Sequence, residues 1–139
     1  GGVLFPGDGP GLEGHSDADA LLHAVTDALL GAVGKGDIGD RYSNVDPRWK
    51  DADSLQFLQE CAKELADEGW RVVNIDITVL AERPKISPAK EMIRSKNAQA
   101  VCIEPSRVGV KATTMEGLGA IGRGEGIACF AVATVETRL

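Results

Sequence analysis

Basic residues are scarce in this sequence relative to acidic ones, and the shortage limits the partners it can bind. The chain has 15 lysine and arginine residues against 21 aspartate and glutamate residues, which gives a net charge of −6 at pH 7. A surface of this sign repels nucleic acid and anionic lipid. The sequence therefore predicts no nucleic-acid partner and no membrane partner. A small anionic substrate is compatible with it where metal ions and backbone amides reverse the local field.

Other features that the sequence lacks further restrict the classes of protein it can belong to. No apolar run reaches the roughly 18 residues that a membrane span requires. The three cysteines, Cys61, Cys102 and Cys129, match no zinc or redox spacing and are expected to be core thiols in a reducing compartment. There is no Gly-x-Ser-x-Gly elbow, P-loop or dinucleotide fingerprint. A reaction whose nucleophile belongs to the substrate would need none of them.

Glycine, by contrast, is abundant. It accounts for 17 of 139 residues, and an average protein contains about 7%. The glycines gather in loops without a period, which indicates tight turns and close backbone approach to a ligand. The length fits one domain, and with no internal repeat or linker we predict that residues 1–139 form it.

Apolar spacing predicts helices over residues 17–33, 53–68 and about 88–98. Ser16 and Asp19 resemble a capping box for the first of these. The residues expected on buried helix faces are Leu22, Val25, Leu29, Ala32 and Val33 in the first helix, and Leu55, Leu58, Cys61, Ala62 and Leu65 in the second.

Strict alternation of apolar and polar residues predicts a half-buried strand over residues 73–79. Further strands are expected at 107–113 and 127–135. Residues 36–50 and 114–126 are expected to be loops. The predicted fold class is α/β, an α+β sandwich in which helices cover one face of a mixed β-sheet.

One polar stripe is the first candidate for chemistry. Asp19, His23 and Asp27 are spaced four residues apart, so a helix places them on one side. Asp19 and His23 could share a metal ion or a hydrogen bond. His15 would lie about 12 Å from His23 along a continuous helix, too far for both to bind one zinc ion, so the two must have different jobs. The simpler interpretation is a partly buried histidine hydrogen-bonded to a carboxylate.

Three further segments could hold phosphate groups. In residues 34–40, glycines flanking Asp37 can expose backbone amides, although most such runs are turns. In residues 111–116, threonine hydroxyls and Glu116 could hold phosphate and a hard divalent ion, or form a solvated hairpin loop. Residues 81–87 could clamp a base and a phosphate through backbone groups and Lys85, or simply cap the following helix.

Taken together, these segments resemble the 2-C-methyl-D-erythritol 2,4-cyclodiphosphate synthase family over essentially the whole chain. Their order and spacing agree without a large gap. The matching pieces are Gly1–Val3, His15–Asp19 with His23, Thr26–Gly31, Gly36–Gly39, Asp46-Pro47, Ala52–Ser54, Asn74–Asp76, Pro84-Lys85, Lys111–Thr114 with Glu116, and Gly122–Gly126.

The resemblance implies a homotrimer with active sites between subunits. It also implies a reaction that converts 4-diphosphocytidyl-2-C-methyl-D-erythritol 2-phosphate into the cyclodiphosphate and releases CMP. The substrate's own 2-phosphate attacks, which agrees with the missing nucleophile. The expected location is the cytoplasm of a bacterium, or the plastid stroma of a plastid-bearing organism.

The resemblance also assigns roles to residues. His15 and Thr114 match transition-state stabilisers, and His23 matches a ligand of Zn²⁺ or a similar divalent metal. Glu116 matches a ligand of Mg²⁺ or Mn²⁺ at the diphosphate, and Arg123 matches a residue facing the trimer's central cavity. The expected substrate-binding residues are Ser16, Asp37, Ile38, Gly39, Tyr42, Ser43, Asn44, Val45, Asp46, Ala81, Glu82, Arg83, Pro84, Lys85, Ile86, Ser87, Thr113, Met115, Glu116 and Arg123.

The sequence departs from the family pattern in three places. Tyr42–Asp46 replaces Phe-Pro-Asp-Thr-Asp, and Ala120 replaces a common phenylalanine of the central cavity. The family's Asp-x-His zinc motif is absent, so we expect about 20 further residues upstream that carry it and add a strand near residues 3–5. Two alternatives stay open: a catalytically impaired trimeric protein that binds nucleotides or isoprenoid diphosphates, and a metal-dependent phosphohydrolase that uses the Asp19–His23 stripe.

Overall fold

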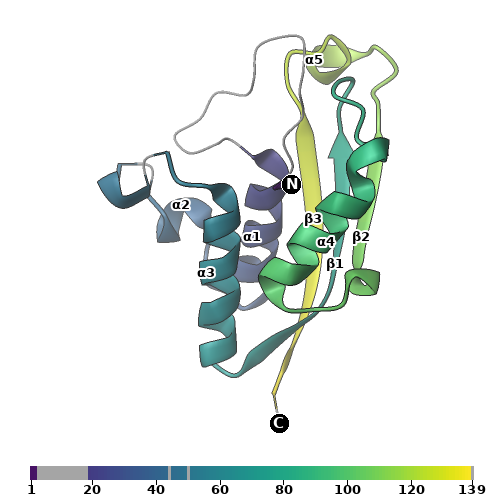
Figure 1. Cartoon of the computed structure of the whole chain (residues 1–139). Coiled ribbons are helices and arrows are strands. Elements are labelled where there is room, and N and C mark those ends of the chain that lie inside the picture. Colours follow the sequence, from purple (N-terminus) through teal and green to yellow (C-terminus); the bar gives the residue numbers. More distant parts are fainter. Residues whose placement is uncertain (3–18, 44, 50, 139) are drawn as a thin grey trace.

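The computed structural model describes residues 1–2, 19–43, 45–49 and 51–138. Within this part of the chain, helices α1, α3 and α4 cover one face of a three-stranded sheet (Figure 1). The mixed α/β fold predicted from the sequence is thereby confirmed. In chain order the elements are α1 (Ala20–Ala32), α2 (Ile38–Arg41), the 3-10 helix η1 (Pro47–Trp49), α3 (Ser54–Asp67), β1 (Trp70–Leu80), η2 (Ser87–Ala89), α4 (Lys90–Val101), η3 (Pro105–Arg107), β2 (Val108–Thr113), α5 (Gly119–Gly122) and β3 (Ala128–Thr137).

The strand order of the sheet is β2-β1-β3. β1 runs parallel to β2, with α4 in the connection between them, and antiparallel to β3. Parallel strands end at the same edge of a sheet, so the chain segments that follow β1 and β2 leave the sheet side by side. Figure 1 shows this edge at the top of the molecule, beside α5. The topology thus brings together residues 81–87 and 114–117, two segments that the sequence singled out separately.

The two long predicted helices form, with one shifted boundary. α3 covers residues 54–67 and is capped by Asp53, whose side chain accepts a hydrogen bond from the Leu55 amide. α1 begins at Ala20 rather than at residue 17. Asp19 has extended backbone and accepts the Leu22 amide, so it is the N-cap residue. The partner expected in a capping box, Ser16, lies outside the described residues.

The regions expected to be loops contain short helices. Residues 36–50 include α2, which begins at a capping box formed by Asp37 and Asp40, and η1, which begins at Pro47. Residues 114–126 include α5. α4 continues beyond residue 98 to Val101. Helices of three or four residues contain too few apolar positions to produce a periodic pattern, so periodicity could not predict them.

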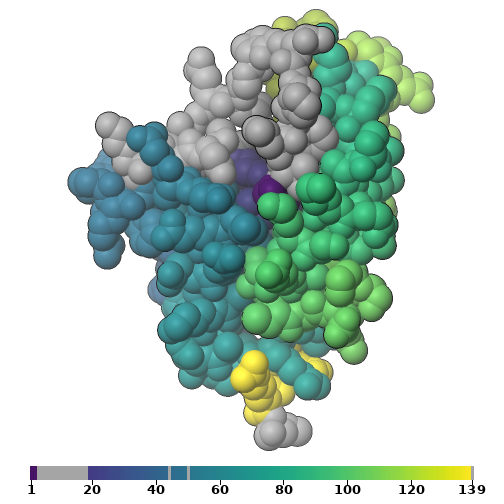
Figure 2. Space-filling view, viewed as in Figure 1, coloured from purple at the N-terminus to yellow at the C-terminus, as the bar shows by residue number. Residues whose placement is uncertain are grey.

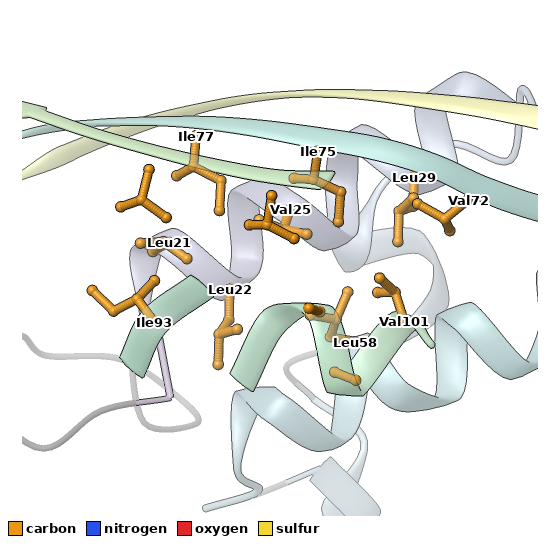
Figure 3. Close-up of a cluster of buried hydrophobic side chains, with 14 of the residues drawn as sticks. Leu21, Leu22, Val25, Leu29, Leu58, Val72, Ile75, Ile77, Ile93 and Val101 are labelled. Atoms are coloured by element: carbon orange, nitrogen blue, oxygen red, sulfur yellow. The ribbon is translucent and has the colours of Figure 1, made fainter. Parts of the chain in front are cut away.

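The core lies between the sheet and the three long helices. Leu22, Val25 and Leu29 of α1 and Leu58 of α3 are fully buried. Figure 3 shows Val25 and Leu29 beside strand residues, and Leu22 and Leu58 farther from the sheet, among the helices. Cys61 and Leu65 are also buried, as predicted, whereas Leu55, Ala62 and Val33 are partly buried against the core. Ala32 is exposed, contrary to the prediction, because the core ends one turn earlier. In the space-filling view, α3 and α4 close this face of the molecule (Figure 2).

A β-bulge near the start of β1 corrects another prediction. Strict alternation would place Val73 on the same side as Ile75. The pairing with β3 shifts between Val72 and Asn74, so Val72 rather than Val73 is buried in the core. The extra residue also keeps Arg71 out of the core, on the opposite face, where it forms an ion pair with Glu136.

The second face of the sheet carries polar and apolar side chains that no described helix covers. Phe130 and Val132 are 65% and 69% exposed there. Lys111 donates to Asp76 across 2.7 Å. Asp76 can lie over the neighbouring strand because residue 109 is glycine, where a Cβ atom would come within 2.7 Å of its carboxylate. Exposed apolar side chains grouped on one surface indicate a protein or ligand interface.

Candidate active site

The segments that follow β1 and β2 form the first part of the candidate site. Ala81 donates its amide to the Thr113 carbonyl at 3.0 Å, which extends the pairing of the two parallel strands by one step. One carboxylate oxygen of Glu82 then accepts the Met115 amide at 2.9 Å and the Gly117 amide at 3.3 Å. Because these contacts join residues more than thirty positions apart, they fix the two segments against each other. We call the residues of these two segments and Arg123 the loop group.

The segment after β2 has an unusual backbone. Glu116 has a φ of 51°, and Gly117 has a φ of 78°. The Glu116 amide donates to the Thr114 hydroxyl at 3.1 Å, and the Thr113 hydroxyl donates to the Thr114 carbonyl at 3.3 Å. The Thr113, Met115 and Glu116 side chains are exposed and that of Thr114 is partly buried. The bend therefore presents two hydroxyl groups and one carboxylate on a short stretch of chain.

Glycine is required where α5 returns to this bend. A Cβ atom on Gly122 would lie 2.3 Å from the backbone carbon of Gly117, which no side chain can accommodate. Gly124 likewise lies close to the Arg83 guanidinium, which would be 3.2 Å from a Cβ atom there. Arg123 is exposed and pairs with Glu125 through two contacts of 3.1 Å. The abundance of glycine noted in the sequence thus has one clear cause in close backbone packing.

Residues 81–87 divide into anchors and exposed groups. Ala81 and Ile86 are buried in the core, so only their backbone groups can face a ligand. The side chains of Arg83, Pro84, Lys85 and Ser87 are exposed. A loop fixed by two buried side chains, with backbone and cationic groups facing outward, fits the expected clamp for a base and a phosphate.

His23 belongs to a second part of the candidate site, on α1. Its Nε2 atom and the Ser54 hydroxyl share a hydrogen bond of 2.7 Å, and the ring of Phe57 lies 6.3 Å away, centroid to centroid. Ser54 is fully buried and Phe57 is 3% exposed. The first turn of α3 therefore fixes the imidazole, which is itself partly buried. Neither contact was predictable from the sequence, because no local spacing relates residues of α1 to residues of α3.

The two aspartates of the polar stripe have separate structural tasks. Asp19 caps α1, and its carboxylate also accepts hydrogen bonds from the backbone nitrogens of Gly1 and Gly2. The Asp27 carboxylate accepts the Ile38 amide at 2.7 Å, so it holds the start of α2 against α1. Asp27 of the polar stripe thus fixes the turn of residues 37–39, which the resemblance expects to bind substrate.

An aromatic cluster supports the loop that follows α2. Tyr42 stacks on Phe57 at 4.9 Å, and Trp49 meets both rings edge-on at 5.1 and 5.4 Å. Burial raises the pKa of Tyr42 to about 12, so its phenol stays protonated near neutral pH. Three of the chain's six aromatic residues fall within residues 42–57. This concentration was a signal in the sequence that could have predicted the cluster.

Some of the remaining residues in the loop after α2 form hydrogen bonds with their neighbours in sequence. Ser43 accepts the Val45 amide, and the Val45 side chain is 84% exposed. Asp46 receives hydrogen bonds from the Arg48 backbone and guanidinium, which lower the pKa of that carboxyl group. Asn44 lies outside the described residues. His23, residues 37–39 and the described residues of 42–46 are called the helix group below.

Charge pairs join α3 to α2 and to the turn before α2. Lys35 donates to Glu64 at 3.0 Å, and Arg41 forms an ion pair with the same carboxylate. Burial opposes ionisation of Glu64, but the hydrogen bonds from Lys35 and Arg41 outweigh it and lower its pKa. The turn expected to bind substrate is thus fixed from two sides, by Asp27 and by this ion-pair network.

The loop group and the helix group are separate within one chain. Among the residues that the structure describes, Glu82 joins the two segments of the loop group, and Ser54, Phe57 and Asp27 support the helix group. None of these contacts joins one group to the other. Figure 1 shows α2 at one side of the molecule and the segments after β1 and β2 at the end of the sheet. A ligand that touched both groups would need either a long reach or a second copy of the chain.

Comparison with known proteins identifies the family. The model of the YgbB family matches residues 1–136. This chain belongs to the YgbB family. It is 53% identical over 138 residues to the 2-C-methyl-D-erythritol 2,4-cyclodiphosphate synthase of Symbiobacterium thermophilum, a match that covers 99% of this chain and 87% of that protein. The resemblance found in the sequence is confirmed.

Some relatives in the family are longer. The chain is 53% identical over 133 residues to the bifunctional enzyme IspD/IspF of Anaeromyxobacter dehalogenans, and the match covers 96% of this chain. It spans about a third of the length of that bifunctional relative. Among solved structures, the CDP complex of IspF from Plasmodium falciparum is similar with a TM-score of 0.81 and 32% identity, covering 91% of this chain and 76% of that one.

Two residues that the resemblance implicates, His15 and Ser16, lie outside the described residues, so their placement stays a prediction. The described part of the chain also contains no group of three or more His, Cys, Asp or Glu side chains placed to hold a metal ion. It supplies His23 as one candidate zinc ligand and Glu116 as one candidate ligand for a harder ion. No helix in the described ranges is both long and apolar enough to cross a membrane.

Proposed function

We propose that this chain catalyses the cyclisation of 4-diphosphocytidyl-2-C-methyl-D-erythritol 2-phosphate to 2-C-methyl-D-erythritol 2,4-cyclodiphosphate with release of CMP, as a phosphorus–oxygen lyase. The observation that carries the proposal is the meeting of residues 81–87 with residues 113–117 at the carboxyl edge of β1 and β2. Open α/β sheets bind ligands at this edge. The CDP complex of a structurally similar protein supports a cytidine nucleotide as the ligand.

The proposed reaction needs no nucleophile from the protein. An oxygen of the substrate's 2-phosphate bonds to the β-phosphorus, and the bond from that phosphorus to the oxygen bridging the two phosphates breaks. CMP leaves with the bridging oxygen, and no water is consumed. The protein's work is therefore to fold the substrate so that the two phosphates meet, and to offset charge as they approach.

The described residues can perform part of this work. The Thr114 hydroxyl accepts the Glu116 amide, so its own proton can be donated to a phosphate oxygen. The Lys85 ammonium is exposed on the nucleotide loop and can pair with a phosphate. The turn at residues 37–39, fixed by Asp27, would hold the methylerythritol part. His15 is proposed as a further stabiliser of the transition state.

Divalent ions are proposed at two places. His23 would provide one ligand to a zinc ion, and Glu116 would provide one carboxylate to Mg²⁺ or Mn²⁺ at the diphosphate, a hard ion that prefers oxygen ligands. Ions bound there would draw negative charge from the reacting phosphates.

A homotrimer with sites between subunits would bring the two groups together. Phe130 and Val132 place exposed apolar side chains on the uncovered face of the sheet, which suits burial against other copies of the chain. A ring of three copies would then place the helix group of one chain beside the loop group of its neighbour. The separation of the two groups within one chain supports this arrangement.

Phosphorus NMR tests the proposed function directly. Substrate incubated with the protein, zinc and magnesium should yield cyclodiphosphate and CMP. Unchanged substrate would instead favour a nucleotide- or isoprenoid-diphosphate-binding protein, and linear phosphate products would favour a phosphohydrolase. The Asp19 carboxylate is used to accept the Gly2 and Leu22 amides at the start of α1. This use argues against the phosphohydrolase alternative, in which Asp19 and His23 would bind a metal ion.

Replacing Glu116 with glutamine should raise the magnesium concentration needed for half-maximal activity by about tenfold, because one charged ligand oxygen is lost from a hard-cation site. A magnesium titration of the initial rate measures this. The matched control is Glu91→Gln, which changes an exposed glutamate on α4 outside both groups. An unchanged magnesium requirement in Glu116→Gln would remove this residue from the proposed ion site.

A further inference from the structure

The Glu82 side chain lies within the segment expected to bind nucleotide, yet its contacts are with the protein. One carboxylate oxygen accepts the amides of Met115 and Gly117. The amide between them, that of Glu116, donates to the Thr114 hydroxyl. Three successive amides of the bend after β2 are therefore satisfied by side-chain oxygens. A concave run of amides of this kind is a ready site for an anion, and here the anion is the Glu82 carboxylate.

The bend depends on these contacts because its backbone is otherwise costly. Glu116 has a positive φ of 51°, a conformation that non-glycine residues seldom adopt without local support. Met115 and Gly117 are exposed, so the apolar core does not hold this stretch in place. Gly122 closes against the Gly117 backbone on one side, and Glu82 binds the amides on the other.

The other end of the contact is rigid. Ala81 and Ile86 are buried on either side of Glu82, and the Ala81 amide pairs with the Thr113 carbonyl. The position of Glu82 is therefore set by the core and by the sheet. A carboxylate fixed in this way transmits the position of residues 81–86 to the bend that carries Thr114 and Glu116.

We propose that Glu82 is a positioning residue that couples the nucleotide segment to the bend carrying Thr114 and Glu116. It acts through the Met115 and Gly117 amides rather than through a contact with substrate. A consequence is that those amides are occupied, so a bound diphosphate is held by the threonine hydroxyls, the cations and any metal ion. The functional meaning of the coupling rests on the proposed function, but the coupling itself does not.

Amide hydrogen exchange followed by NMR tests the coupling without any ligand. In Glu82→Ala, exchange at Met115 and Gly117 should accelerate about tenfold or more, since two charge-assisted hydrogen bonds are lost. Glu82→Gln keeps an acceptor oxygen of the same reach and should restore most of the protection. Glu60→Ala, at an exposed glutamate of α3, is the control and should leave both amides unchanged. Unaltered exchange at Met115 and Gly117 in Glu82→Ala would overturn the proposal.

Calorimetry with CMP adds a readout that general destabilisation would not reproduce. CMP affinity in the presence of magnesium should fall about tenfold in Glu82→Ala and recover in Glu82→Gln, in parallel with the exchange rates. If accelerated exchange left CMP affinity unchanged, the bend would not be coupled to the nucleotide segment, and the proposal would fail. If the unaltered chain bound no CMP, the proposed function would fail instead, and the exchange experiment would still decide the role of Glu82.

Discussion

Replacing His23 with alanine should lower turnover about a thousandfold, because a bound metal ion stabilises transition-state charge by several kcal/mol and each 1.4 kcal/mol or so is tenfold in rate. The imidazole is fixed by the buried Ser54 hydroxyl and by Phe57. A ligand held in one orientation by buried neighbours is suited to a metal ion. The rate of CMP release and the zinc content by mass spectrometry measure the effect.

The matched control for this substitution is Lys63→Ala on α3. Lys63 is exposed and pairs with Asp67 one turn along the same helix, an interaction worth a few tenths of a kcal/mol. Its loss should leave the rate and the zinc content unchanged. Thermal unfolding of both variants would show that the core is intact. A His23→Ala protein with the normal rate and normal zinc content would exclude His23 as a ligand.

Introducing a lysine in place of Phe130 should abolish both assembly and activity. The side chain lies on the sheet face that no described helix covers, opposite Thr78 of β1, and is 65% exposed. In a trimer packed through this face, a lysine would be buried without a partner, which costs several kcal/mol at each subunit contact. In the separate chain the same lysine stays in water, so the fold itself should survive. Light scattering should report a monomer of about 14.6 kDa for this variant, and a species three times as large for the unaltered chain if it forms the proposed trimer.

Phe130→Leu provides the control, because it keeps an apolar side chain of similar reach and should remain a trimer. Activity assayed on the same samples links assembly to catalysis. Full activity in a monomeric Phe130→Lys protein would mean that one chain contains a complete site. The proposed sharing of sites between subunits would then be wrong.

Much of this fold was predictable because its long elements carry clear periodic patterns. α1, α3, β1 and β2 each bury a regular set of side chains, such as Leu22 and Leu29 or Ile75 and Ile77, and β3 alternates partly buried and exposed residues. The errors lie where the pattern is short or interrupted. α2 and α5 have four residues each and bury none of them. The bulge at Val73 inverts the alternation for the start of β1, and only the pairing with β3 reveals it.

The sequence allowed the residues of the candidate site to be predicted, but most of the contacts between them could not be predicted. The resemblance pointed to His23 and to residues 81–87, and the topology brings the latter beside Thr114 as the parallel strands require. The contact of His23 with Ser54 joins residues 31 positions apart on two helices, and no local spacing encodes it. Glu82 could not be separated from its neighbours in the sequence either. The use of its carboxylate depends on amides that lie on another loop.

The separation of the helix group from the loop group within one chain has a genetic consequence. If each site takes His23 from one subunit and Lys85 with Glu116 from the next, an allele damaged at His23 still encodes a sound loop group. An allele damaged at Lys85 still encodes a sound helix group. In assemblies formed at random from equal amounts of both products, about one site in four would combine the two sound halves. Two inactive alleles of this gene would therefore complement each other, whereas two alleles damaged in the same group would not.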